Sequence, residues 1–191
     1  MVTSETRSGQ RARTEIIDAA LARFATDGFT ATSIQHIADD SGYSKSSVLY
    51  HFDSKERMLD AALSPALDAL EGLLAHLPNA SEANTTALLE HFVDFLLDFR
   101  REAAIVLIQG QSLAELPIMV RANALITRLA DGICAVAPDL PQRMRVGVGL
   151  AGAAYVLATG DAFLSESQLQ PDEDVRAALL GVLSELFLWK H

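Results

Sequence analysis

Residues 32–56, TSIQHIADDSGYSKSSVLYHFDSKE, contain the start and stop signals of two short helices and the start of a third. Thr32 followed by Gln35 has the spacing of a capping box, which predicts that a helix begins there. Gly42 ends this helix because glycine adopts the positive φ of a tight turn at little cost. Ser44 is then expected to cap a second short helix. Two short helices around a glycine turn are typical of a helix-turn-helix motif.

The residues on either side of this motif extend it to a trihelical unit. Apolar residues recur with helical spacing from position 14 to 26, and Gly28 supplies a left-handed C-terminal cap. Asp53 and Ser54 provide the cap of a further helix. Helices this short, joined by such short turns, are expected to pack into one compact unit.

The second helix of the motif presents small donors, one cation and two polar-tipped rings outward. These side chains are Lys45, Ser46, Ser47, Leu49, Tyr50 and His51. They suit the base edges and phosphates of a DNA major groove. The alternative is an ordinary helical hairpin with a solvated face. The DNA interpretation is favoured because the short helix, the turn glycine and this outward set occur together.

The rest of the chain also shows helical periodicity, and the predicted fold class is all-α. An interruption of the first long helix is expected at Ser64-Pro65, where proline removes a backbone donor. The predicted helices span residues 54–75, 82–101, 103–114, 118–135, 141–164 and 171–190. We therefore predict a helix-turn-helix domain over residues 1–57, with residues 1–10 as a flexible arm, and a helical bundle over residues 58–191.

Composition narrows the functional classes. Half of the residues are hydrophobic, and 15 basic against 25 acidic side chains give a net charge of −10. Binding to nucleic acid by bulk charge alone is therefore disfavoured. The first 57 residues carry a net charge of −1 and the remainder −9, so phosphate contacts are expected only at the front end. No apolar run reaches the length of a membrane span and no signal peptide is evident, which predicts a cytoplasmic protein without membrane contact.

The front end resembles the tetracycline-repressor (TetR) family of bacterial transcription regulators. The residues that carry the resemblance are Gly28-Phe29, Thr32, Ile37-Ala38, Gly42, Ser44-Lys45, Tyr50-His51-Phe52 and Ser54-Lys55-Glu56. It covers about the first 60 residues. Leu49 and Tyr43 depart from it, because an aromatic and a small aliphatic residue are usual at their positions. The resemblance implies an N-terminal DNA-binding domain and a larger bundle for effector binding and dimerisation.

The resemblance also implies which residues touch DNA. Phosphate contacts are expected from Thr32, Ser33, Tyr50, His51 and Lys55, and Gln35 is expected at a base edge or the backbone. Base contacts are expected from Lys45, Ser46 and Ser47. Arg11 and Arg13 would add contacts from the flexible arm.

The middle of the chain holds the candidate effector pocket. Its expected lining combines aromatic and aliphatic side chains with amides and a phenol: Phe92, Phe95, Leu96, Phe99, Gln109, Met119, Asn123 and Tyr155. Such a set suits a small-molecule cavity, and it suits a plain core equally well.

The last two predicted helices are the candidate dimer interface. Gly147, Gly149 and Gly152 lie inside a helix at a cost of about 1 kcal/mol each relative to alanine, which is explained if another helix approaches closely. That helix belongs either to a second copy, as the resemblance implies, or to the same subunit.

The sequence favours a ligand-responsive repressor that binds a pseudo-palindromic operator as a homodimer and is released by a small, largely apolar effector. The alternatives are a helical protein-interaction module and a similar regulator without a small-molecule inducer. No enzymatic activity, cofactor or metal is expected, because the five histidines lack metal-ligand spacing and no phosphate-binding glycine loop is present. The lone cysteine, Cys134, is expected to be a buried hydrophobe.

Overall fold

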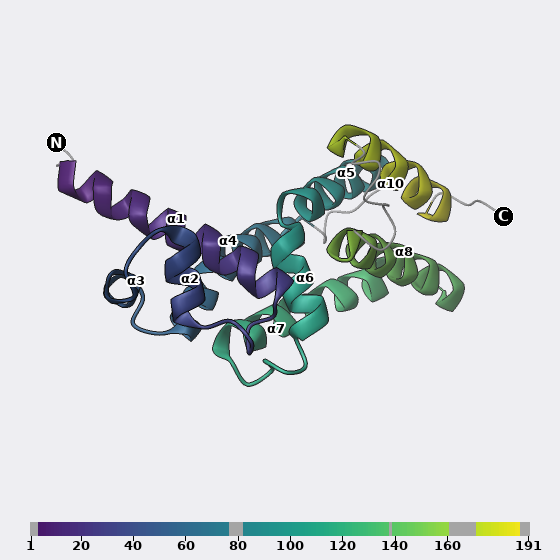
Figure 1. The fold of residues 1–191 in the computed structure, drawn as a ribbon. Coiled ribbons are helices and arrows are strands. Elements are labelled where there is room, and N and C mark those ends of the chain that lie inside the picture. The colour runs from purple at the N-terminus through teal and green to yellow at the C-terminus, as the bar shows by residue number, and fades with distance from the viewer. Residues whose placement is uncertain (1–3, 77–81, 138, 161–170, 188–191) are drawn as a thin grey trace.

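The computed structural model describes residues 4–76, 82–137, 139–160 and 171–187, and all regular structure within these ranges is helical (Figure 1). The prediction of an all-α fold is thereby confirmed. None of the helices in these ranges combines the length and hydropathy that a membrane crossing requires.

Helices α1 (Ser4–Thr26), α2 (Ile34–Ser41) and α3 (Lys45–His51) form the N-terminal unit, which we call the head. Each contributes fully buried side chains to one core, including Phe24, Ile37 and Val48. The flexible arm predicted for residues 1–10 is not observed in its described part, because α1 is helical from Ser4 onward. Residues 4–10 contain no proline, and the single glycine among them, Gly9, does not end the helix.

The turns of the head use two glycines with positive φ, Gly28 at 88° and Gly42 at 74°. Gly42 caps α2 as predicted, with its N–H donating to the Ala38 carbonyl. The predicted capping box is displaced by one residue: Ser33, and not Thr32, is the N-cap, and His36 is its reciprocal partner. Thr32 is unsuited to the cap because it is 2% exposed and its hydroxyl donates to the Gly28 carbonyl over 2.8 Å.

The head is continuous with three of the helices that follow it. Helix α4 (Lys55–Leu74) packs against α1 and α7 (Pro117–Val136), and α6 (Arg100–Gln109) packs against α1. One hydrophobic core therefore runs from the head into α4, α6 and α7. A second core joins α5 (Glu82–Asp98), α8 (Leu140–Ala158) and α10 (Asp172–Phe187) at the end of the molecule opposite α3 (Figure 1).

Pro65 was predicted to kink the helix or force it to restart, and helix α4 continues through Pro65 without a restart. The proline removes only one main-chain donor, and the Ser64 hydroxyl donates to the Asp60 carbonyl over 2.7 Å. The flanking turns of α4 are held by buried leucines on both sides of the proline. The predicted extensions of α8 and α10 to positions 164 and 190 end in residues outside the described ranges.

The carboxylate of Glu102 on α6 is partly buried near α1, which makes its ionised form unfavourable for stability. Glu102 on α6 is half-buried, and this burial raises its pKa; Asp18 on α1 raises the pKa further, whereas Arg101 lowers it. Because the ionised form is disfavoured in the folded state, Glu102 destabilises the protein at pH values above its folded pKa. This penalty disappears as the pH falls below the ordinary value of 4.5.

We therefore expect Glu102→Gln to stabilise the protein at pH 7, by about 0.5 kcal/mol after solvent screening. Thermal unfolding of wild type and variant from pH 4 to 8 measures the difference. The gain should be largest at neutral pH and absent near pH 4. A gain that is independent of pH would show that ionisation of Glu102 is not its cause.

Candidate nucleic-acid interface and cavity

Helix α3 is short, firmly capped and placed at the edge of the molecule. The Ser44 side chain accepts from the Ser47 N–H over 3.1 Å, which confirms the predicted N-cap. Val48 and Phe52 fix the inner face of the helix in the head core. Figure 1 shows α3 at one edge of the fold, and its outward residues Lys45, Ser46 and Tyr50 are exposed.

The outer face of α3 carries the predicted contact residues. Lys45 and Ser46 are exposed, and the Ser46 hydroxyl lies 2.9 Å from that of Ser44. Tyr50 is 85% exposed, with its ring edge-on to the His51 ring at 5.4 Å between centroids. A cation, hydroxyls, a phenol and an imidazole on one narrow helix can serve both phosphates and base edges.

Of the DNA contacts predicted around the start of α2, two side chains are exposed and one is buried. Ser33 and Gln35 are exposed, and the Gln35 amide donates to Asp39 over 2.7 Å. Thr32 is buried, with its hydroxyl within the head. Its side chain therefore cannot reach a phosphate in this conformation.

Salt bridges and hydrogen bonds connect the helices of the head. The guanidinium of Arg23 on α1 binds both oxygens of Asp40 on α2 and also reaches Asp27 over 2.7 Å. This bidentate pair holds the pKa of Asp40 below its usual range. The Tyr43 hydroxyl in the turn donates to Glu15 over 2.5 Å, which raises the pKa of the phenol.

The two arginines predicted for a flexible arm are held on helix α1. Arg11 pairs with Glu15 over 2.8 Å, and the Arg13 guanidinium lies 4.6 Å from the centre of the Phe52 ring. Arg13 therefore lies on α1 close to the end of α3. Arg11 and Arg13 belong to a helix and do not form the predicted flexible arm.

Lys55 at the start of α4 was predicted to contact a phosphate, but its ammonium group binds backbone carbonyls of the head. Its Nζ donates to the Phe29 carbonyl over 2.7 Å and to the Thr32 carbonyl over 2.9 Å. It also lies 4.3 Å from the centre of the Phe29 ring. Two of its three donors are therefore used to join α4 to the loop between α1 and α2.

We expect Lys55→Met to destabilise the protein by about 1–3 kcal/mol, because the variant keeps the apolar stem but leaves two carbonyls without this donor. Chemical denaturation measures this loss. DNA affinity should fall because the head is less well held. Its salt dependence should be unchanged, because the Lys55 ammonium group is engaged by the two carbonyls and does not neutralise a phosphate. A salt slope reduced by about one would instead identify Lys55 as a phosphate contact.

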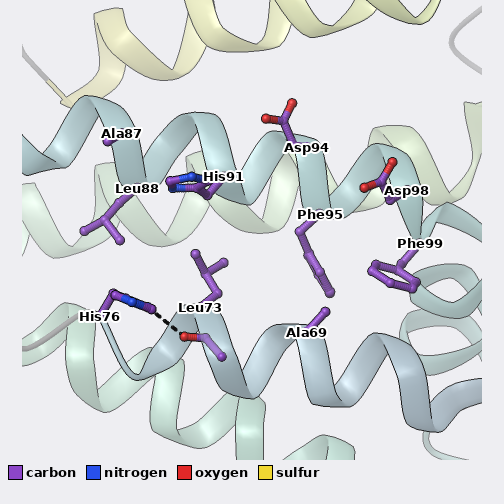
Figure 2. A pocket seen from close by; sticks show the side chains of 11 residues that line it. Ala69, Leu73, His76, Ala87, Leu88, His91, Asp94, Phe95, Asp98 and Phe99 are labelled. Atoms are coloured by element: carbon purple, nitrogen blue, oxygen red, sulfur yellow. Dashed lines mark hydrogen bonds between the residues drawn. The ribbon is translucent and has the colours of Figure 1, made fainter.

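A cavity of about 560 Å³ lies between α4 and α5 (Figure 2). Its walls are mainly apolar, with two histidines near one end. The lining residues are Ala69, Gly72, Leu73, His76, Ala87, Leu88, His91, Asp94, Phe95, Asp98 and Phe99. Figure 2 shows the Phe95 ring pointing toward α4, whereas Asp94 and Asp98 project from the other side of α5. Arg176 on α10 binds Asp94 and lowers its pKa.

The structure does not bring the eight predicted pocket residues together around one cavity. Phe95 and Phe99 line the cavity between α4 and α5, while Phe92 and Leu96 are buried in the second core. Met119 is buried in the first core, and Asn123 and Tyr155 are exposed elsewhere. Gln109 binds the head instead.

Sequence reasoning missed the contribution of α4 to this cavity. Ala69, Leu73 and His76 follow one another at helical spacing and face α5. This spacing was visible in the sequence, but it did not indicate which helix would lie opposite. Cys134, expected to be buried, is exposed on α7, because its helix turns that face away from both cores.

An apolar strip remains uncovered on α8 and α10. Leu140, Met144 and Val148 recur every four residues on α8, and each is more than half exposed. Gly152 continues the strip with open space beside it, and Val182 on α10 is also more than half exposed. Gly149 faces the other way, where an added Cβ would lie 3.1 Å from Leu183. Gly149 therefore allows close packing of α8 against α10 within the subunit. Gly152 faces open space, where a further helix can approach.

Comparison with known proteins agrees with this arrangement. Residues 16–62 match the family model described as bacterial regulatory proteins, tetR family. Over 87 residues the chain is 41% identical to the HTH-type transcriptional repressor KstR2 of Rhodococcus jostii, which covers 46% of this chain and 41% of the relative. Over 84 residues it is 30% identical to the biofilm operon negative transcriptional regulator IcaR of Staphylococcus aureus, covering 44% of this chain and 45% of the relative.

The matches to these curated relatives thus span less than half of their length. A crystal structure of a TetR-family regulator from Streptomyces coelicolor A3 superposes over 90% of this chain and 89% of its own, with a TM-score of 0.70 and 22% identity. This likeness extends the shared fold beyond the head into the helical bundle. Both relatives are named as transcriptional regulators.

Proposed function

We propose that the protein is a homodimeric transcriptional repressor of the TetR family, because residues 16–62 match the model of that family of bacterial regulatory proteins. It binds a pseudo-palindromic operator and is released by a small, largely apolar effector. The observation that carries the proposal is the presentation of α3, with its capped N-terminus, buried inner face and exposed polar outer face. Tyr50 is 85% exposed and lies on the same short helix as Lys45, Ser46 and Ser47. These side chains can contact the phosphates and base edges of DNA.

Dimerisation is supported by the uncovered strip on α8 and α10. Burying Leu140, Met144, Val148 and Val182 against a second copy removes these apolar side chains from water. A single head reads only a few base pairs, so two heads held in register are needed for specificity. The strip and α3 lie at opposite ends of the fold, which leaves both heads of a dimer accessible (Figure 1).

Effector binding is supported by the cavity between α4 and α5. Its volume is suited to a small molecule, and Phe95 with Phe99 supplies an aromatic wall. Helix α4 forms the opposite wall and begins four residues after α3 ends. A ligand that separates α4 from α5 would therefore change the position of the head relative to the rest of the subunit.

The proposal is tested by selecting duplexes from a pool with a random 30-base-pair centre, using the purified full-length protein. We expect enrichment of a pseudo-palindrome with half-sites about one helical turn apart. Binding to the selected duplex should weaken steeply with salt. A pool that shows no enrichment over several rounds would contradict the proposal and favour a protein-interaction role for the head.

A further inference from the structure

The side-chain amide of Gln109 joins the last turn of α6 to the head at two points. Its Oε1 accepts from the Phe29 N–H and its Nε2 donates to the Phe24 carbonyl, each over 2.7 Å. These partners lie 80 and 85 residues away in the chain. Both polar ends of one side chain are therefore used to hold the end of α1 and the turn that follows it.

Phe29 is the point at which three helices meet. Its N–H is bound by Gln109 of α6, and its carbonyl is bound by Lys55 of α4 over 2.7 Å. Its ring packs against Phe24 of α1 at 5.1 Å between centroids. Gly28, immediately before it, has a φ of 88°, a conformation that side chains rarely adopt and that directs the chain through this junction.

The other end of α6 lies at the cavity. Phe99 is the residue that precedes the first turn of α6, and its ring lines the cavity between α4 and α5 (Figure 2). Helix α6 has ten residues, which corresponds to a rod of about 15 Å. One short helix therefore connects a wall of the cavity to the two hydrogen bonds that hold the head.

We propose that Gln109 is a positioning residue that sets the orientation of the head relative to the helical bundle.

Three variants separate the contributions of the amide. Gln109→Met has a similar length and removes both hydrogen bonds, and Gln109→Glu keeps an acceptor for the Phe29 N–H but loses the donor to Phe24. Gln111→Met is the matched control, because Gln111 is exposed two residues further along. Stability alone would not distinguish positioning from packing, so the orientation of the head must be measured in folded protein.

Orientation is measured by the distance between spin labels on the exposed native Cys134 of α7 and on a cysteine introduced by Gln10→Cys at the outer part of α1. Labelled chains are diluted with unlabelled protein so that distances within one subunit are observed. We expect a shifted or broadened distance distribution for Gln109→Met, an intermediate one for Gln109→Glu and an unchanged one for Gln111→Met. Exchange of the Phe29 amide hydrogen should accelerate at least tenfold in Gln109→Met and less in Gln109→Glu.

An unchanged distance distribution in folded Gln109→Met would overturn the proposal. If that variant does not fold, an unchanged distribution in Gln109→Glu overturns it in the same way. The measurement uses neither DNA nor ligand, so a failure to select an operator would refute the proposed function while leaving this result in place. Once an operator has been selected, Gln109→Met should weaken its binding about tenfold with an unchanged salt slope.

Discussion

Val148→Asp will be a monomer and will bind the selected operator at least 100-fold more weakly than the wild type. Val148 lies in the centre of the uncovered strip on α8 and is 67% exposed in the single subunit. A carboxylate at this position costs little in the monomer because water reaches it. In the dimer it would be buried in an apolar interface without a partner, at a cost of several kcal/mol.

The loss of operator affinity follows from the loss of the second head. Two linked heads bind their half-sites as one unit, whereas a monomer must bind each half-site separately. Sedimentation and titration of the selected duplex measure the two effects. Val120→Asp is the matched control, since Val120 is 56% exposed on α7 and lies outside the strip. If Val148→Asp is still a dimer, α8 and α10 do not form the dimer interface. If it is a monomer that retains operator affinity, dimerisation is not needed for operator binding.

Lys45→Glu will also reduce operator affinity by at least 100-fold, without loss of folding or dimerisation. Lys45 is exposed at the first position of α3 and is not one of the residues of the head core. The substitution removes a cation and places a carboxylate where DNA phosphates and base edges approach. Both changes oppose binding, and repulsion from the phosphates adds to the lost contact.

Fluorescence titration at several salt concentrations measures the effect of this charge reversal. Arg101→Glu, on the exposed surface of α6, makes the same change in net charge at a distance from α3 and should leave affinity within a few-fold of wild type. Equal losses in the two variants would show that net charge, and not the face of α3, controls binding. Ser47→Ala should change the selected sequence at one position of each half-site and leave the salt slope unchanged.

Local signals allowed the head to be predicted in detail. The caps at Gly42 and Ser44 and the inward position of Val48 depend on residues near in sequence, and the structure contains all three. The displaced capping box shows the limit of such signals. Thr32 and Ser33 are both suitable N-cap residues. The buried hydrogen bond from the Thr32 hydroxyl to the Gly28 carbonyl leaves the cap to Ser33, and spacing alone does not reveal this bond.

The site beyond the head depends on contacts between distant residues. Gln109 was predicted to line a pocket because an amide suits one, yet its partners Phe29 and Phe24 lie about 80 residues earlier. Phe92 and Phe95 lie on the same predicted apolar face, but only Phe95 reaches the cavity, while Phe92 enters the second core. Helical periodicity identifies the buried face of α5, but it does not say which neighbouring helix covers each part of that face.

Methylation interference on the selected duplex tests the reading of DNA by α3 most directly. Guanine N7 lies in the major groove, where a helix of this kind would contact bases. We expect two patches of interference centred about one helical turn apart on one face of the duplex, and both should disappear in Lys45→Glu. Interference that is absent, confined to a single patch, or unchanged by Lys45→Glu would contradict the claim that two copies of α3 read the operator.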